Sequence, residues 1–143
     1  MGRLLVVTLG LSMTGCGVIG SNPLAPASLP LPPTIFTYAP LVAGLGFYVQ
    51  DVDVFQSSVQ VNSTVRWNDG GKDLDLYWTN SSCQIEAGRL VGTGCQVLYQ
   101  STSSAGTSEQ VSGPASAGAT LRFFVINFAN GSEPVTLTIT LRR

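Results

Sequence analysis

Pairs of acidic side chains at alternate positions are the residues of this chain best suited to chemistry. Asp51 and Asp53 form one pair, and Asp73 and Asp75 form the second. Calcium takes about six to eight oxygen ligands, commonly carboxylates and carbonyls, so the first pair with one residue of the second could form a calcium site. In the alternative, which we favour, Asp73 and Asp75 accept hydrogen bonds from loop N–H groups and fix the local chain.

Catalysis is not expected from these residues. The sequence contains no histidine, which is the commonest general base and a common zinc ligand. Serine is plentiful, but no Gly-x-Ser-x-Gly motif presents one as a nucleophile. Two carboxylates can hydrolyse glycosides, yet Asp73 and Asp75 lie two residues apart, a spacing more typical of a structural pair on one strand. The sequence therefore predicts a protein that is not an enzyme.

Aromatic residues offer a second kind of site, a platform for a sugar or a peptide. The candidates are Tyr48, Tyr77, Trp78 and Tyr99. Aromatic residues in strands more often pack in the core or against a neighbouring strand. We favour that interpretation.

The elements that must position these residues are predicted to be strands. Charged residues make up only 10% of the 143 residues and hydrophobic residues 44%, so the chain can form a core. No segment after residue 20 shows sustained helical spacing of apolar residues. The sequence predicts an all-β domain over residues 34–143, a single antiparallel, jelly-roll-like β-sandwich of seven to eight strands. The expected strands cover residues 35–42, 47–55, 58–67, 73–78, 96–100, 109–111, 121–128 and 135–141.

The second acidic pair lies on the most informative of these strands. Period-two geometry places Leu74, Leu76 and Trp78 on one face, with the two aspartates and Tyr77 on the other. The glycines and Asx residues at 68–71 predict a tight reversal, so that residues 58–67 and 73–78 would pair as a β-hairpin.

The N-terminus is predicted to be a signal peptide spanning residues 1–15. A positive start precedes an apolar stretch of ten residues at 4–13, which is too short for a membrane span of about 20 residues. Met13-Thr14-Gly15-Cys16 resembles the lipobox of bacterial lipoproteins, and this resemblance implies lipidation of Cys16. Residues 16–33 hold five prolines and form a linker, and Gly17 resembles the pattern of lipoproteins sorted to the outer membrane.

The two remaining cysteines, Cys83 and Cys95, are expected to form a disulfide, because an even pair in an exported protein usually does. Residues 84–94 between them are expected to form an irregular excursion rich in glycine. A redox or metal pair is the alternative, but no CxxC motif or histidine supports it.

Several motifs together resemble the bacterial pre-peptidase C-terminal domain, a β-sandwich found beside secreted proteases and collagenases. They are residues 51–55, Trp67, residues 73–77, residues 109–111, the turn at Ala117-Gly118, residues 123–125 and the Thr-rich last strand. The resemblance covers residues 44–141, and the DLDLY segment at 73–77 is its specific part. It implies a sandwich fold, and in some members calcium binding through acidic residues near the domain's start, or binding of collagen and other polymers.

These observations predict a non-enzymatic, lipid-anchored protein of the bacterial cell envelope, at the outer membrane, with a binding or structural β-sandwich domain. Its expected partners are the membrane, through the lipid anchor, and an envelope protein or polysaccharide. Nucleic acid is not expected, because the net charge is −1 and no basic stripe is present. The alternative is a calcium-dependent module that binds a carbohydrate or protein polymer and is accessory to a secreted hydrolase.

Overall fold

The computed structural model describes residues 31–55, 59–104 and 106–143. The predicted signal peptide, Cys16 and most of the linker lie outside these residues. The described part of the chain contains strands and no helix. The strands are β1 (Thr34–Tyr38), β2 (Leu41–Val42), β3 (Phe47–Asp53), β4 (Val59–Trp67), β5 (Leu74–Asn80), β6 (Gln84–Glu86), β7 (Arg89–Val91), β8 (Val97–Ser101), β9 (Ser108–Ala115), β10 (Thr120–Asn127) and β11 (Glu133–Arg142).

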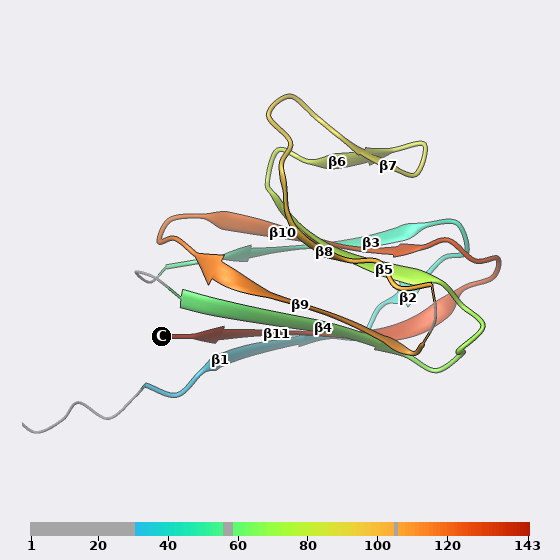
Figure 1. Cartoon of the computed structure of the whole chain (residues 1–143), viewed down its shortest axis with the longest axis horizontal. Coiled ribbons are helices and arrows are strands. Elements are labelled where there is room, and N and C mark those ends of the chain that lie inside the picture. Colours follow the sequence, from blue (N-terminus) through green and yellow to red (C-terminus); the bar gives the residue numbers. More distant parts are fainter. Residues whose placement is uncertain (1–30, 56–58, 105) are drawn as a thin grey trace, which may run out of the picture.

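Two antiparallel sheets face each other and form a sandwich (Figure 1). One sheet has the order β1-β11-β4-β9, with β2 added alongside β11, and the second has the order β3-β10-β5-β8. The short β6–β7 hairpin stands above the outer face of the second sheet (Figure 1). The all-β sandwich predicted from the sequence is confirmed.

Alternation of residues in the strands builds the core. Every second residue of β4 and of β11 is buried between the sheets, as expected for strands with one face covered. From the second sheet, Trp78 lies at the centre, with its ring 5.1 Å from that of Tyr99 and 5.5 Å from that of Phe123. The inward set of β5 is Leu74, Leu76 and Trp78, as the sequence predicts.

The central strand β10 is covered on both faces. Phe123 and Val125 face the main core, whereas Phe124 and Ile126 face outward and pack in a second, smaller cluster. That cluster lies under the β6–β7 hairpin, which contributes Ile85 and Leu90. Cover on both faces therefore accounts for the nearly continuous apolar composition of this strand.

The predicted hairpin between residues 58–67 and 73–78 is wrong. β4 belongs to the first sheet and β5 to the second, so the intervening loop, 68–73, crosses from one sheet to the other. Gly70 and Gly71 do not adopt the positive φ values that a tight reversal would need. The buried carboxylate of Glu133 holds the loop instead, accepting hydrogen bonds from the backbone N–H groups of Asn68 (3.0 Å) and Asp69 (3.2 Å).

Two smaller expectations also differ from the structure. Residues 84–94 form the ordered β6–β7 hairpin and not an irregular excursion. The strand expected at 109–111 extends over Ser108–Ala115, since it pairs with β4 along most of that strand.

Candidate functional site

The β6–β7 hairpin is fixed to the sandwich at its base. Cys83 and Cys95 form the predicted disulfide, with an S–S distance of 2.04 Å, and Cys83 is fully buried. Asn80, at the end of β5, donates a hydrogen bond from Nδ2 to the carbonyl of Gly94 (2.7 Å). Its backbone N–H donates to the carbonyl of Gln96 (3.1 Å). The excursion therefore leaves and rejoins the sheet at a closed base.

The tip of the hairpin is a two-residue turn, Ala87-Gly88. Both residues have positive φ, 49° for Ala87 and 74° for Gly88, as the type I′ turn favoured in hairpins requires. Glycine adopts this conformation freely, whereas alanine does so at a cost. The turn places the exposed Arg89 beside the end of β10.

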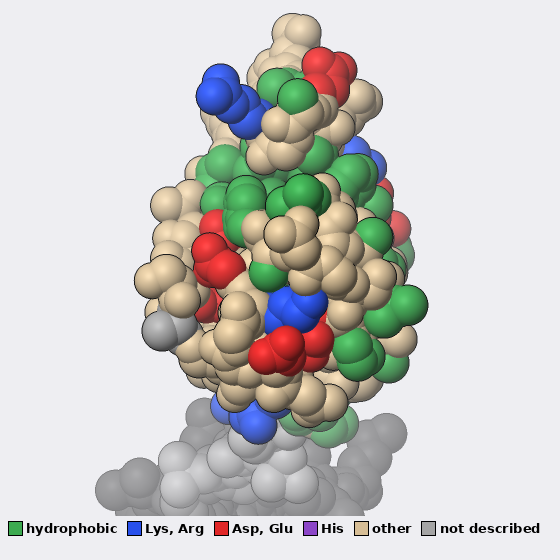
Figure 2. All heavy atoms as spheres, turned by 90° about the vertical axis from the view of Figure 1, so that its right-hand side faces the viewer, with side chains coloured by type: hydrophobic (Ala, Val, Ile, Leu, Met, Phe, Trp, Pro, Cys, Tyr) green, Lys and Arg blue, Asp and Glu red, His purple; other side chains and the backbone are tan. Residues whose placement is uncertain are grey.

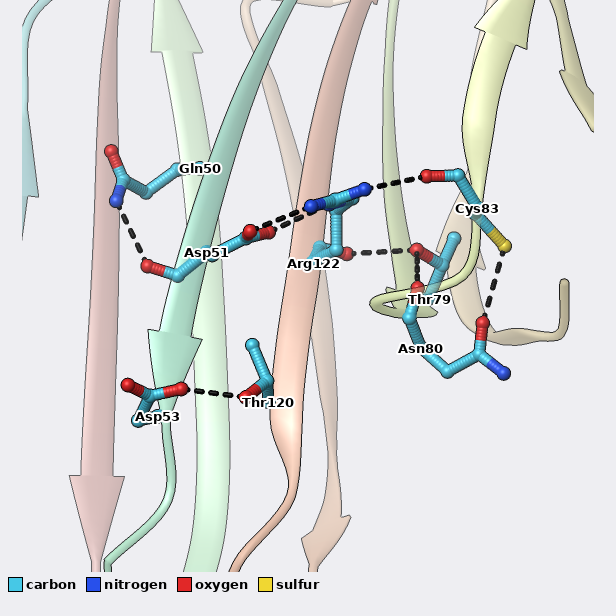
Figure 3. Close-up of polar contacts among 8 residues, drawn as sticks. All are labelled: Gln50, Asp51, Asp53, Thr79, Asn80, Cys83, Thr120 and Arg122. Atoms are coloured by element: carbon cyan, nitrogen blue, oxygen red, sulfur yellow. Dashed lines mark hydrogen bonds and ion pairs between the residues drawn. The ribbon is translucent and has the colours of Figure 1, made fainter. Parts of the chain in front are cut away.

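Arg122, on the outer face of β10, joins the hairpin to β3 (Figure 3). Its guanidinium donates to both carboxylate oxygens of Asp51, each at 2.7 Å, and to the carbonyl oxygen of Cys83 at 2.9 Å. The hydrogen bonds from Arg122 hold the pKa of Asp51 below its usual value, although burial acts in the opposite direction. This fork-shaped contact fixes the distance between β3, β10 and the start of the excursion.

A groove runs between the hairpin and the outer face of the second sheet. Two adjoining hollows of about 270 Å³ and 350 Å³ compose it, one beside β6 and one beside the hairpin tip. Its floor and open margin carry large apolar side chains with 41–71% exposure, and we name these four residues the apolar rim: Leu45, Phe47, Val49 and Phe128. Figure 2 shows hydrophobic side chains gathered in this region, directly below the protruding hairpin.

The four aspartates of the calcium hypothesis do not converge on one point. Asp51 and Asp53 lie on the outer face of β3, where Asp51 pairs with Arg122 and Asp53 accepts a hydrogen bond from Thr120 (2.6 Å). Asp75 lies on β5, which is separated from β3 by β10. The residue of β5 directly across β10 from Asp51 is Thr79, and Asp75 lies four residues from Thr79 along the strand. That offset is about 13 Å along the strands. In the described ranges, no group of three or more Asp, Glu, Cys or His residues is arranged to hold a metal ion.

The second acidic pair occupies a different environment. Asp75 is 8% exposed and accepts a hydrogen bond from the hydroxyl of Tyr77 (2.8 Å). Burial raises the pKa of Asp75, and the nearby Asp73 and Glu109 raise it further, against the effect of the Tyr77 hydrogen bond. Burial and Asp75 together raise the pKa of Tyr77 to about 12. Glu109 is itself buried and accepts hydrogen bonds from the hydroxyl of Ser101 and the backbone N–H of Ser103 (2.9 Å for the latter).

Replacing Asp75 with asparagine should stabilise the protein at neutral pH by about 3 °C in melting temperature. The folded-state pKa of Asp75 is raised, so its contribution to stability is fully present below the unfolded value of 3.8 and is lost as pH rises through the folded pKa. Asparagine keeps an acceptor for the Tyr77 hydroxyl and carries no charge. The gain should therefore shrink on acidification and disappear below pH 3.8. Thermal unfolding of both proteins between pH 3 and 8 checks this, and a gain independent of pH would contradict it.

The structure does not assemble the aromatic platform. Trp78 is 1% exposed in the core, and Tyr48 and Tyr99 pack against that core from its edges. Tyr77 packs on the opposite side of the sheet with the cluster under the hairpin. The favoured interpretation of these residues as packing groups is confirmed for Trp78.

Solved structures similar to the sandwich include the following two. One is the pre-peptidase C-terminal domain of a collagenase from Bacillus anthracis, with a TM-score of 0.51 and 16% identity, covering 74% of this chain and 87% of that domain. The fold is that of a pre-peptidase C-terminal-like β-sandwich. The second structure is the Yersinia pseudotuberculosis-derived mitogen, with a TM-score of 0.53 and 11% identity, covering 77% of this chain and 86% of the mitogen.

These similarities show the fold of this chain alone, and they do not show what the chain binds. No family model matches the chain, and no curated protein sequence matches it at a significant level. Across the described residues, no helix has the length and apolar character needed to cross a bilayer.

Two features of the groove were missed in the sequence. Arg122 lies in a strand of mostly apolar residues, and its hydrogen-bond partners are 39 and 71 residues away in sequence. The apolar rim was also missed, because the alternating strand predicted over residues 47–55 does not by itself show which of its two faces is buried. Phe47 and Val49 share the outer face with Asp51 and Asp53, while Tyr48, Val52 and the following Val54 point inward. The sequence did contain a signal for this face: Asp51 and Asp53 occupy the same alternate positions as Phe47 and Val49, and charged residues mark the solvent-facing side of a strand.

Proposed function

We propose that this protein is a non-enzymatic, lipid-anchored cell-envelope protein whose β-sandwich is a binding domain, with the apolar rim as its contact surface. The observation that carries the proposal is the cluster of four large apolar side chains, 41–71% exposed, beside a hairpin held by a disulfide. Contiguous exposed apolar surface on a soluble domain marks an interaction site more often than scattered single residues do. A rigid wall beside it lowers the entropic cost of ordering the site on binding.

Two matched valines test this use of the surface. Val49 belongs to the apolar rim and is 41% exposed, whereas Val97 lies on β8, at the opposite edge of the same sheet, and is 43% exposed. The full chain and its Val49→Asp and Val97→Asp variants would each be used to retain components of solubilised envelope. The Val49 variant should lose the retained components and the Val97 variant should keep them. Equal retention by both variants would overturn the proposed surface.

The lipid anchor rests on the lipobox and is tested by a single substitution. Cys16→Ser should leave an uncleaved, unacylated protein, since the thiol at Cys16 is the atom that would accept the diacylglyceryl group. Stable anchoring by lipid needs two or more acyl chains, so the variant should lose the outer-membrane association expected of the wild type. Intact mass and fractionation of both proteins check this. A wild-type protein without acyl chains would contradict the anchor.

The alternative proposal is a calcium-dependent polymer-binding module accessory to a hydrolase. One similar solved structure is a pre-peptidase C-terminal domain of a collagenase, which favours this alternative. The separation of the two acidic pairs and the Asp51–Arg122 ion pair speak against a shared calcium site.

Calcium is therefore expected to leave the melting temperature unchanged. Asp51 already has a bidentate cationic partner. The remaining carboxylates cannot supply, at one point, the roughly six or more oxygen ligands that calcium needs. Thermal unfolding in millimolar calcium and in EDTA checks this. A rise of several degrees with calcium, lost in Asp53→Asn, would favour the polymer-binding alternative.

A further inference from the structure

Strand β3 is an open edge of the second sheet. It pairs with β10 on one side and, among the described residues, with no strand on its other side. At one end of the pair, the N–H of Asn127 donates to the carbonyl of Gly46 (2.9 Å). At the other end, the N–H of Val54 donates to the carbonyl of Ala119 (2.9 Å). Because the antiparallel register between these ends is unbroken, the even-numbered residues of β3 bond to β10 and the odd-numbered residues direct their N–H and C=O groups to the open edge.

The same odd-numbered residues project their side chains onto the outer face, beside the groove. In order along β3 they are Phe47, Val49, Asp51 and Asp53. The first two belong to the apolar rim and line the hollow beneath β6. Asp51 is neutralised by Arg122, whereas Asp53 is exposed and, among the described residues, forms no ion pair and accepts a hydrogen bond from the hydroxyl of Thr120. The edge therefore has an apolar half, formed by Phe47 and Val49, and an acidic half, which ends at the negatively charged Asp53 with no cationic partner among the described residues.

One of the backbone groups at the edge already has a side-chain partner. The amide of Gln50 donates to the carbonyl of Asp51 (2.9 Å), and the hydroxyl of Tyr48 donates to the Gln50 side-chain oxygen (2.8 Å) (Figure 3 shows the first contact). This contact confirms that the Asp51 carbonyl points away from β10. Side chains that occupy edge groups reduce uncontrolled pairing between sheets. The edge groups of Phe47 and Val49, next to the groove, have no such cover in the described part of the chain.

We propose that the open edge of β3 binds an extended peptide segment of a partner protein, which adds as a fifth strand to this sheet. The segment carries apolar residues at two alternate positions, against Phe47 and Val49, and a lysine or arginine against Asp53. Main-chain hydrogen bonds give such strand addition its affinity, and the side-chain pairs across the strands give its specificity. This deepens the proposed function, on which it rests, by naming the class of partner for the same surface.

A second copy of this chain complements the edge less well. Its own β3 carries two apolar residues followed by two acids, so no register gives Asp53 a basic partner. A segment with an apolar pair and a basic residue satisfies both halves at once. Charge complementarity therefore favours a different chain as the occupant.

Selection of a displayed library of random ten-residue peptides on the full chain tests the proposal. We expect enrichment of sequences with two apolar residues at alternate positions and a basic residue four positions from the nearer of them, the spacing of Phe47, Val49 and Asp53 along β3. Val49→Pro should weaken binding of an enriched peptide about tenfold or more, because it removes an N–H at the open edge. The fold should survive, since that N–H does not bond to β10. Val49→Thr keeps the N–H and is the matched control.

A charge reversal supplies a second readout that does not depend on proline. Asp53→Lys should change the enriched charge from basic to acidic while the apolar pair remains. Enriched peptides that bind Val49→Pro and wild type equally, or no enrichment, would overturn the proposal. A dimer in sedimentation that Val49→Pro dissociates would assign the edge to a second copy and overturn it too. Retention of envelope components through Val49 without any peptide preference would refute the strand addition and leave the proposed function standing.

Discussion

Loss of the Cys83–Cys95 disulfide should lower the free energy of unfolding by about 3 kcal/mol. The bridge closes a loop with a sequence separation of 12, and a loop near this size restricts the unfolded chain by about that amount in the chain-entropy account. The folded state is affected as well, because the bridge holds Ile85 and Leu90 over Phe124 and Ile126. Without it, the hairpin should open while the sandwich stays folded, and the wall of the groove should be lost.

Urea unfolding of the wild type and of Cys83→Ala/Cys95→Ala measures the loss, and wild type reduced with a dithiol provides an independent comparison. Limited proteolysis should cut the variant within residues 84–94 before the strands of the sandwich, because the opened hairpin exposes its backbone. Arg122 would keep its contact with Asp51, so β3 should remain protected. A loss under about 1 kcal/mol, or an unchanged cleavage pattern, would show that packing and hydrogen bonds at Asn80 suffice to hold the hairpin.

Period-two alternation predicted which segments form strands and which faces are buried. In β11, Val135, Leu137 and Ile139 are buried as expected, because one inner face imposes one pattern on the sequence. The same pattern does not encode which strand is the neighbour. Residues 68–71 have the composition of a hairpin turn, but the chain there crosses between sheets, with Glu133 from a distant strand as the anchor. Only the tertiary fold brings that carboxylate to the loop.

Less of the groove than of the fold could be predicted from the sequence. The disulfide followed from the cysteine count, since two thiols remain once Cys16 is assigned to the predicted lipid anchor, and two thiols leave one pairing. The contacts of Arg122 depend on three segments that meet only in the folded sheet. The acidic pairs were visible as residue types, but β10 lies between the strands that carry them. The residue pattern within one strand predicts which face of that strand is buried. Predicting a site also requires the order of the strands in the sheet, because that order decides which side chains become neighbours.

Replacing Gly113 with alanine should destabilise the protein by about 2 kcal/mol. Gly113 is buried on β9, and the ring of Tyr99 from the opposite sheet lies directly against it. A Cβ at position 113 would lie 2.8 Å from Cε1 of Tyr99 and closer still to two other ring carbons. The ring also packs against Trp78, with centroids 5.1 Å apart, so it cannot move without disturbing the core. The effect is steric, because Gly113 does not have positive φ.

A double-mutant cycle with Tyr99→Leu distinguishes overpacking against the Tyr99 ring from a general sensitivity of β9 to substitution. The smaller side chain leaves room for the new methyl group, so Gly113→Ala should cost less in the Tyr99→Leu background, with a coupling of about 1 kcal/mol or more. Gly70→Ala is the matched control, because a Cβ there meets nothing closer than 3.7 Å and should change stability by less than about 0.5 kcal/mol. Chemical denaturation of the variants measures these differences. Strictly additive losses would refute the direct contact as the cause, since two groups that compete for one space cannot act independently.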